Sequence, residues 1–453
     1  MNQQVNSFRS NHASAACPIP THLGSVSHSF LAPALKEALN SSEYASNTHI
    51  VPGEADDWCA PYANENPRSI IFSSDTDLLL YDYPQEVRII YLKDVDLHPE
   101  PKFRGYSPPA LCQSLGLSSL VPLAYCLMQD PWMTDSLLLE KAKAIDDESK
   151  LYRDFRKRYI TTATILSKAG THWTDPSLQR LDVRISELAH QSLKTTFTPI
   201  IYLPFLVEDQ YRTSAWNVGA DLRTIAYSLL TSDRCKAQEY RRKAQKITIH
   251  DICLYSPQEL YATIQAHSNS TNAWLHWAAE EQVPPDLVWP LFAIGLVLPK
   301  LKSPPRVALV LRMIDADFDN TWDFIHLNAC LQAALYSLRC LKQCVDVWLS
   351  IRSESSPQLL PYAHKLHDAL QSMGSIAELF TVPGQARRSF GDLDSLQELI
   401  VRVYASVNVE IPVEQPSTRK TKKQQKDAHR KERLKREAST KMSSNAFKVL
   451  GNM

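Results

Sequence analysis

Short apolar runs and acidic clusters alternate over residues 48–92. Thr48–Val51, Ser69–Phe72 and Val87–Leu92 are rich in β-branched and aromatic residues, which predicts three strands. A short helical pattern follows each of the first two runs, and Phe30–Leu39 before them has helical spacing as well. Strands that alternate with short helices predict a partial parallel α/β sheet with flanking helices.

The pattern changes near residue 107, after which apolar residues recur with helical spacing. Thr134–Tyr159 predicts one long amphipathic helix with many charged positions. Residues 160–412 continue as helical segments broken by prolines, and Arg306–Leu311 is the one run there that suggests a strand. We therefore predict a mostly α-helical region after the α/β part.

Composition divides the chain into four parts. Residues 1–28 are polar and rich in Ser, Asn and His, which predicts a disordered N-terminus. The α/β part occupies 29–135 and the helical region 136–412, and a basic low-complexity tail covers 413–453. A length of 453 residues accommodates two or three domains.

The formal net charge of zero conceals a strongly basic tail. Eleven basic and three acidic residues lie between Arg419 and Lys441, so the rest of the chain is mildly acidic. Such a tail contacts DNA or RNA phosphates without sequence preference, acts as a nuclear localisation signal, or is simply a solvated charged segment. Because it contains no interleaved aromatic residues, we expect nuclear import or nonspecific nucleic-acid contact rather than base recognition.

Cysteine spacing and hydropathy exclude several other classes of protein. The nine cysteines form no C-x-x-C pair and no zinc-like spacing with histidine, which predicts buried thiols in a reduced interior. The N-terminal segment lacks the apolar core of a secretory signal. The longest apolar run, Leu287–Pro299, is interrupted by Pro290 and is shorter than the ~20 residues of a membrane helix. We expect an intracellular protein with no membrane span.

Carboxylates follow the first two predicted strands. This acidic cluster consists of Glu54, Asp56, Asp75 and Asp77. The carboxyl ends of neighbouring parallel strands meet at one edge of a sheet, where α/β proteins bind ligands, and carboxylate oxygens suit Mg²⁺ or Mn²⁺. Taken singly, each acid is also explained as a helix cap or as a partner of the helix dipole. Taken as two clusters after two strands, the acids favour a divalent-cation site.

The residues around the acidic cluster resemble a known motif. Pro52–Asp56 with Cys59-Ala60, and Ser73–Leu79, resemble the internal motif of flap-endonuclease/XPG-type nucleases of the PIN-like superfamily, most closely the fungal asteroid-like branch. Phe30–Leu39 and Tyr202–Leu230 also resemble that branch, so the resemblance covers roughly residues 20–250. It implies that the acidic cluster holds metal ligands. It also implies that Asp130, in the segment LMQD, matches the last acid of the family motif, without the glycine that usually precedes it.

The chain departs from the family pattern at several positions. Active relatives supply further aspartates from an N-terminal segment, whereas no aspartate precedes Asp56 here. No glycine lies between Gly116 and Gly170, where the resemblance implies a helical hairpin that clamps duplex DNA. Pro61 interrupts the predicted helix that follows Glu54. We therefore expect that part of the acidic site is missing.

These observations lead to two functional hypotheses. In the first, the chain is a Mg²⁺-dependent nuclease acting on DNA or RNA phosphodiester bonds, weak or inactive because its ligand set is incomplete. In the second, it is a non-catalytic nuclear interaction or scaffold protein that retains a degenerate nuclease-like fold. The helical region 136–412 then binds protein partners whose nature the sequence does not indicate.

Overall fold

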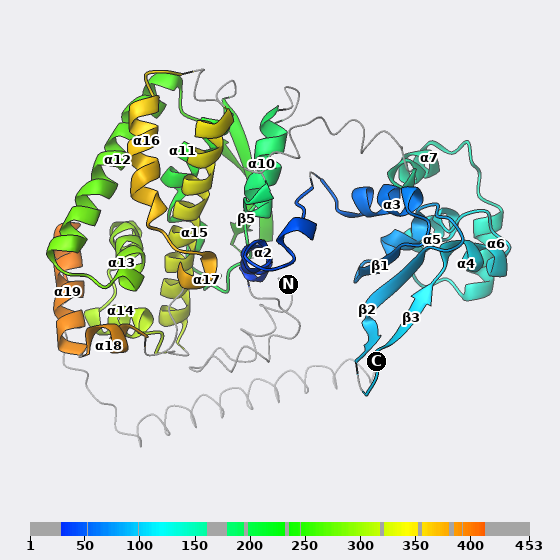
Figure 1. Ribbon diagram of the computed structural model, residues 1–453, viewed down its shortest axis with the longest axis horizontal. Helices are drawn as coiled ribbons and strands as arrows, with labels where there is room; N and C mark the ends of the chain where they lie inside the picture. Colours follow the sequence, from blue (N-terminus) through cyan, green and yellow to red (C-terminus); the bar gives the residue numbers. More distant parts are fainter. Residues whose placement is uncertain are drawn as a thin grey trace, which may run out of the picture.

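The computed structural model describes residues 29–412 with gaps at residues 52, 98, 161–178, 194–197, 232–234, 245, 318–320, 352–355, 380–384 and 392. Figure 1 shows two lobes, a small one built around a sheet and a large one built mainly from helices. The predicted disordered N-terminus and the predicted basic tail lie outside the described residues. No helix in the described part of the chain combines the length and the apolar character that crossing a bilayer requires.

The small lobe is a three-stranded mixed sheet with short helices around it. Strand β1 pairs in parallel with β2, and β2 pairs antiparallel with β3. The elements are α3 (Asp56–Glu65), β1 (Ile70–Ser73), η3 (Asp77–Leu80), β2 (Arg88–Asp96), β3 (Lys102–Tyr106), α4 (Pro108–Leu115), α5 (Val121–Gln129), α6 (Asp135–Lys143), α7 (Lys150–Arg156) and η4 (Lys157–Tyr159). The parallel pair with flanking helices confirms the predicted PIN-like α/β class for this part of the chain.

Two predicted elements of this region were wrong. Thr48–Val51 forms no strand. The backbone of Ile50 is hydrogen-bonded to the side-chain amide of Gln179 instead: the Ile50 N–H donates to Gln179 Oε1 at 2.8 Å, and Gln179 Nε2 donates to the Ile50 carbonyl at 3.0 Å. The predicted long helix Thr134–Tyr159 is broken into α6 and α7. The carboxylate of Asp146 accepts the N–H of Glu148 at 3.0 Å in the intervening turn, which stabilises the break.

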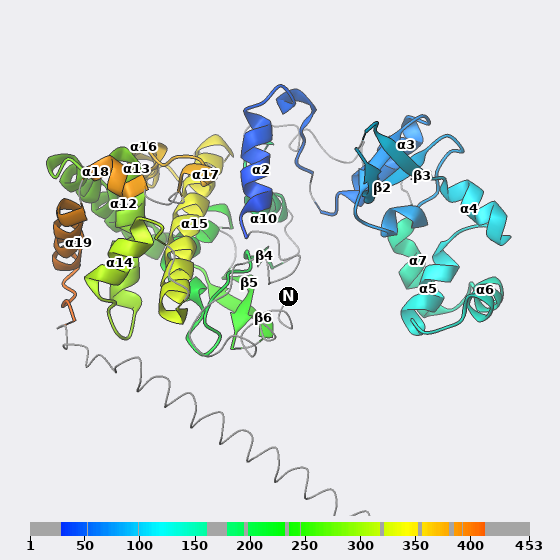
Figure 2. The same cartoon turned by 90° about the horizontal axis from the view of Figure 1, so that it is seen from below.

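The large lobe combines helix α2 near the start of the described chain with everything after residue 178. Its elements are α2 (Leu31–Asn40), η2 (Ala45–Asn47), α10 (Val183–Leu193), β4 (Ile200–Tyr202), η5 (Ala215–Asn217), α11 (Ala220–Leu230), β5 (Lys236–Lys243), β6 (Lys246–Cys253), α12 (Pro257–Glu280), α13 (Pro285–Val297), η6 (Leu298–Lys300), α14 (Val307–Ile314), α15 (Trp322–Ile351), α16 (Leu360–Gln371), α17 (Ile376–Leu379), α18 (Gln385–Phe390) and α19 (Leu393–Ser406). Helix α2 lies beside α10 and α17 in Figures 1 and 2. The large lobe is therefore built from two parts of the chain that the small lobe separates in sequence.

The mostly helical character of this region is confirmed, but a second sheet interrupts it. Strands β4, β5 and β6 repeat the arrangement of the small lobe, one parallel pair followed by an antiparallel hairpin. The hairpin was missed because β5 reads KAQEYRRK and buries Glu239 and Arg242 in place of apolar residues. The strand-like run Arg306–Leu311 is instead the start of helix α14.

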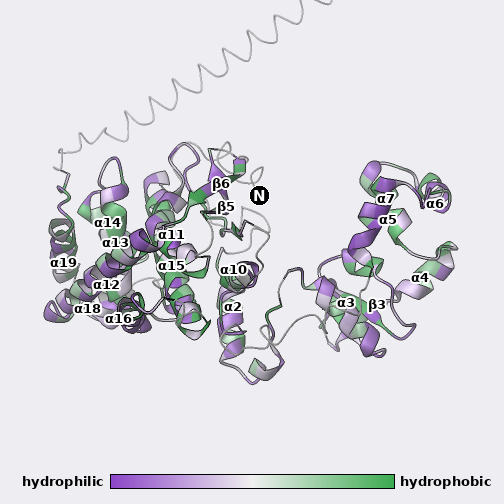
Figure 3. Ribbon diagram, turned by 90° about the horizontal axis from the view of Figure 1, so that it is seen from above, coloured by the Kyte–Doolittle hydropathy of each residue, from purple (hydrophilic) through white to green (hydrophobic). Residues whose placement is uncertain are grey.

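Helix α15 forms the centre of the large lobe. It packs against α11, α13, α14 and α16, and Figure 2 shows it running through the middle of the lobe. Most of its side chains are buried, including Cys330, Cys340 and Cys344, which confirms the prediction of buried thiols for this helix. Figure 3 shows hydrophobic and hydrophilic residues mixed along the surrounding helices, as expected for helices with one buried face.

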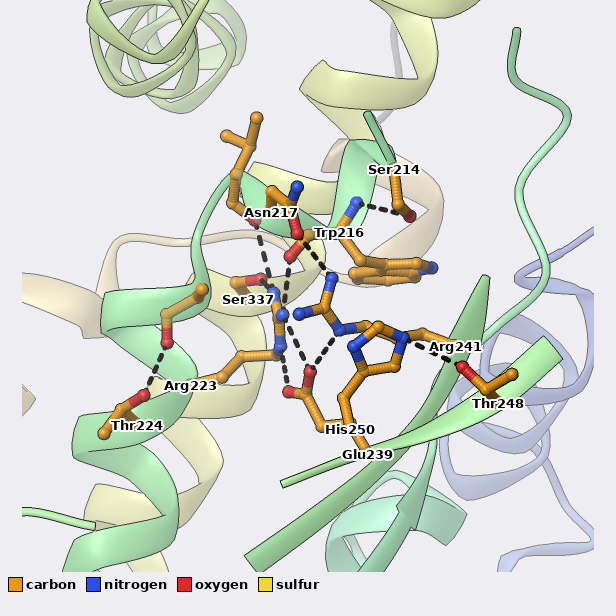
Figure 4. Close-up of polar contacts among 12 residues, drawn as sticks. Ser214, Trp216, Asn217, Arg223, Thr224, Glu239, Arg241, Thr248, His250 and Ser337 are labelled. Carbon is orange, nitrogen blue, oxygen red and sulfur yellow. Dashed lines mark hydrogen bonds and ion pairs between the residues drawn. The ribbon is translucent and has the colours of Figure 1, made fainter. Parts of the chain in front are cut away.

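A fully buried arginine links four elements of the large lobe. The Arg223 guanidinium, on α11, has no exposed surface and donates five hydrogen bonds. Two go to the carboxylate of Glu239 on β5, with Nε 2.7 Å from Oε1. The others go to the Ser337 hydroxyl on α15 and to the carbonyls of Trp216 and Val218 (Figure 4). Burial would raise the pKa of Glu239, but the Arg223 charge holds it below its usual range.

Close packing around Arg223 depends on a glycine. Gly219 precedes α11 with a φ of 72°, in the left-handed region. A Cβ placed there would lie 2.6 Å from the Ser337 Oγ, so a side chain would displace the hydroxyl that Arg223 uses. Gly219 therefore allows α11 to begin directly against α15.

Two further buried arginines hold the large lobe together through ion pairs. Arg242 on β5 pairs with Glu208 at 2.6 Å, and the other Glu208 oxygen accepts the N–H of Ala215. Arg339 on α15 pairs with Asp182 at 3.0 Å and with Glu37 of α2. The second network ties α2 to the large lobe across some three hundred residues of sequence.

We expect Glu239→Gln to destabilise the large lobe by about 3–5 kcal/mol, because it leaves the buried Arg223 charge uncompensated. Urea unfolding measured by circular dichroism checks this value. The matched control is Asp251→Asn on the adjacent strand β6, whose pair with Lys236 spans 3.9 Å and is largely exposed. The control should cost less than about 1 kcal/mol. Equal losses in the two variants would contradict the assignment.

Candidate metal-binding acidic site

The turn after β1 presents two acids at the carboxyl end of that strand. The Asp75 N–H donates to the Ser73 hydroxyl at 3.0 Å, and the Asp77 N–H donates to Asp75 Oδ1 at 3.0 Å. Helix η3 then begins at Asp77. Asp75 therefore stabilises its own turn with one carboxylate oxygen, and both side chains remain exposed.

The other two acids of the cluster lie at the start of α3. Glu54 is exposed and precedes the helix, and Asp56 is its first residue and is partly buried. No side chain caps this end of α3 by a hydrogen bond, so capping does not account for either acid. Asp57, the next residue, instead accepts a hydrogen bond from the Tyr81 hydroxyl at 2.9 Å.

The negative charges of the two halves of the acidic cluster act on one another. The pKa of Asp56 is raised to about 6, first by burial and then by the charges of Asp75, Asp77, Glu54 and Asp57. Within the described residues, no lysine or arginine forms an ion pair with any member of the cluster. The charges of the other three predicted acids therefore act on Asp56, and none of the four has a lysine or arginine ion-pair partner among the described residues.

A set of tyrosines surrounds the acids. The Tyr159 hydroxyl donates to Asp77 Oδ2 at 3.1 Å, and burial followed by the Asp77 charge raises the pKa of Tyr159 to about 12. Tyr91, the parallel register partner of Ser73, has a buried hydroxyl that finds no hydrogen-bond partner among the described residues. Its pKa is also raised to about 12, by burial, by Tyr106 and by the nearby acids. The same part of the chain offers no partner to the Tyr83 hydroxyl, and burial and Asp56 raise the pKa of Tyr83.

Sequence reasoning missed these tyrosines. Tyr81 and Tyr83 follow η3 directly, and Tyr91 lies on the strand next to β1, so proximity to the acids was the available signal. Tyr159 lies 82 residues from Asp77, and only the packing of η4 brings it to the site. The rings of Tyr81 and Tyr159 meet edge to face at 5.5 Å and form part of the apolar cluster beneath the site.

Asp130 lies apart from the acidic cluster electrostatically. It follows the last turn of α5, and its Oδ1 accepts the Trp132 N–H at 3.0 Å. Its charge is not among those that raise the pKa of Asp56. Its role as a metal ligand therefore stays a prediction.

The acidic cluster has the ligand atoms that a divalent cation needs, but its side chains are not arranged around one position. Four carboxylates without a cationic partner are the hard oxygen donors that Mg²⁺ prefers. However, among the residues that the structure describes, no group of three or more His, Cys, Asp or Glu side chains is arranged to hold an ion. The carboxylates would have to move closer together to coordinate one.

The chain is similar to a known protein family. The chain matches the family described as "XPG domain containing" over residues 27–254, which confirms the resemblance inferred from its motifs. The matched residues include α2, the whole small lobe and the large lobe as far as the end of β6. Neither a curated protein nor a solved structure matches the chain.

We expect Asp56→Asn to stabilise the protein in EDTA at pH 7.5. The pKa of Asp56 rises from 3.8 to about 6 on folding, so the ionised carboxylate lowers stability as the pH rises through this range. After discounting for solvent screening the gain is at most about 1 kcal/mol, or about 2–4 °C in Tm. Differential scanning calorimetry measures it. The gain should vanish at pH 4, where Asp56 is protonated in the folded protein.

Proposed function

The chain belongs to the XPG domain containing family, and we propose that its small lobe is a weak divalent-cation-dependent nuclease domain with an incomplete acidic site. The observation that supports this most directly is the raised pKa of Asp56, caused after burial by four neighbouring acids that have no basic partner among the described residues. Like charges held together without compensation cost stability. A protein that retains them gains when a cation binds.

The residues of the site have distinct parts in this proposal. We assign Asp56, Asp75 and Asp77 to the ion. Tyr159 orients Asp77 by its hydrogen bond, and Asp75 also stabilises the turn with its Oδ1, which leaves Oδ2 for the ion. A bound Mg²⁺ would activate water and neutralise charge on the phosphate. Without the cation, the carboxylates repel a phosphodiester, so nucleic-acid binding at the site depends on prior occupation.

The expected activity is low. Two-metal phosphodiester hydrolysis needs ions clamped ~3.5–4 Å apart by a full ligand set. In the described residues the acids do not form a three-ligand group, and Asp130 lies outside their shared field. One weakly held ion is the most that the acidic cluster supports.

A second candidate function is a non-catalytic nuclear protein that uses the nuclease-like fold to bind partners. The same absence of a three-ligand group among the described residues favours it. In this alternative the predicted tail Arg419–Lys441 gives nuclear residence and nonspecific contact with DNA or RNA, and the large lobe binds proteins.

Nuclease activity distinguishes the two candidates. We expect slow cleavage of single-stranded or flap substrates, measured on denaturing gels. The assay contains about 5 mM Mg²⁺ or Mn²⁺, which is enough to saturate a weak site. Asp75→Asn should abolish cleavage, because the remaining acids cannot hold the ion. Asp135→Asn, at an exposed acid that is not among the predicted ligands, is the matched control for loss of one carboxylate. Cleavage that survives Asp75→Asn would point to a contaminant and would favour the non-catalytic function.

Metal binding can be tested without activity. We expect the affinity for Mn²⁺, measured by electron paramagnetic resonance, to fall by about tenfold between pH 7 and pH 5. The reason is that Asp56, with a pKa of about 6, must lose its proton to bind the ion. Asp56→Asn should remove most of this pH dependence along with most of the affinity. An affinity that does not change over this range would rule out Asp56 as a ligand.

A further inference from the structure

A basic cleft in the large lobe lies apart from the acidic site. It has a volume of about 860 Å³, within the range of ~300–1,000 Å³ that is usual for ligand pockets. The loop after η6, the first turns of α14 and α15, and the segment before η5 form its walls. Figure 2 shows α14 beside α15 in this part of the lobe. Its charged residues are Arg212, Lys300, Lys302, Arg306, Arg312 and Asp323.

Positive charge in the cleft is only partly neutralised. Arg212 pairs with Asp323, Lys300 with Asp221 at 2.8 Å, and Arg312 with Asp317 at 3.3 Å. Lys302 and Arg306 are exposed and form no ion pair within the part of the chain that the structure describes. These two side chains therefore offer unpaired cationic donors at one wall of the cleft.

The loop that carries the two unpaired cations is held in place. Pro304 and Pro305 lie between Lys302 and Arg306 and restrict the backbone φ angles. The hydroxyl of the buried Tyr404, on α19, donates to the carbonyl of Pro305 at 2.7 Å. The cations are thus presented from a preorganised segment, which lowers the entropy lost on binding an anion.

A buried imidazole and an exposed aromatic ring complete the cleft. His326 lines it with only 4% of its surface exposed, and its Nδ1 has no hydrogen-bond partner in the part of the chain that the structure describes. Burial lowers the pKa of His326, which keeps the ring neutral and able to donate one N–H. Tyr211, at the same cleft, is 71% exposed. An exposed tyrosine that lines the same cleft as two exposed cations is the combination that binds a base and its phosphate.

We propose that this basic cleft binds a nucleotide unit, with its phosphate on Lys302 and Arg306 and its base on Tyr211, either free or within a single strand. An acidic peptide would use the cations but would make no use of the exposed tyrosine ring. A duplex would shield its base faces from Tyr211. The inference does not rest on the proposed nuclease function, because none of the lining residues belongs to the acidic site.

The test uses the full chain in EDTA, which separates binding from cleavage. Fluorescence anisotropy measures binding of two labelled probes, an oligo-dT and an ATP analogue. The oligo-dT has about ten nucleotides, so that it is longer than one cleft. We expect Lys302→Gln with Arg306→Gln to weaken binding about 25-fold at ~0.1 M salt and to lower the salt slope by about 1.4, from ~0.7 per lost phosphate contact. The matched control, Lys243→Gln with Lys246→Gln, removes two exposed cations from the β5–β6 turn and should change little.

A second pair of variants tests the stacking contact. Tyr211→Ala should weaken oligonucleotide binding about tenfold and leave competition by inorganic phosphate unchanged, which separates stacking from loss of fold. Tyr44→Ala is the control, since Tyr44 is 58% exposed and lies outside the cleft. An oligonucleotide carrying 5-iodouracil should also cross-link to the peptide that contains Tyr211.

The outcomes separate the sources of the ligand and can overturn the proposal. Preference for the ATP analogue identifies a free nucleotide, and preference for oligo-dT identifies a strand. Equal losses in the two double variants, equal competition by poly-glutamate, or cross-linking only outside the cleft would each refute it. Because binding is measured in EDTA, the absence of metal-dependent cleavage would not affect this result.

Discussion

The full burial of one guanidinium imposes the strongest constraint on this structure. Arg223 has five N–H donors and no contact with water, so every donor needs an acceptor fixed at the right distance. Those acceptors come from η5, β5 and α15, and each element is therefore held to α11. Gly219 makes the approach of α11 to α15 possible. The sheet and the central helix of the large lobe cannot shift independently without leaving a buried charge unpaired.

The two lobes differ in whether their charged side chains are paired. In the large lobe, buried acids and bases are matched, as in the pairs Arg223–Glu239 and Arg242–Glu208. In the small lobe, four carboxylates gather around Asp56 without a basic partner in the described residues. Matched charges specify packing, whereas unmatched charges favour a ligand of opposite sign. The basic cleft follows the second pattern with the sign reversed, since Lys302 and Arg306 form no ion pair with any described residue.

The part of the candidate site that could be predicted is the part that is local in sequence. Asp75 and Asp77 follow a β-branched run directly, so their place at the end of β1 was evident from the pattern. Their grouping with Asp56 also followed from the order of strand and helix, although the first predicted strand does not form. Tyr159 and Gln179 could not be anticipated, because their contacts join residues 82 and 129 positions apart. The residues next to Asp130 in the sequence gave no sign that its charge is not among those that raise the pKa of Asp56.

The sequence by itself determined the helical periods, the apolar strands of the small lobe, the position of the acids after them and the family motif. Each of these depends on neighbouring residues and on elementary backbone preferences. The tertiary structure decided which charges are buried. Strand β5 reads as a polar segment until Glu239 meets Arg223 and Arg242 meets Glu208, because burial of a charge becomes favourable only when its partner arrives from another element. For the same reason only the folded chain distinguishes paired carboxylates from the unpaired acids around Asp56.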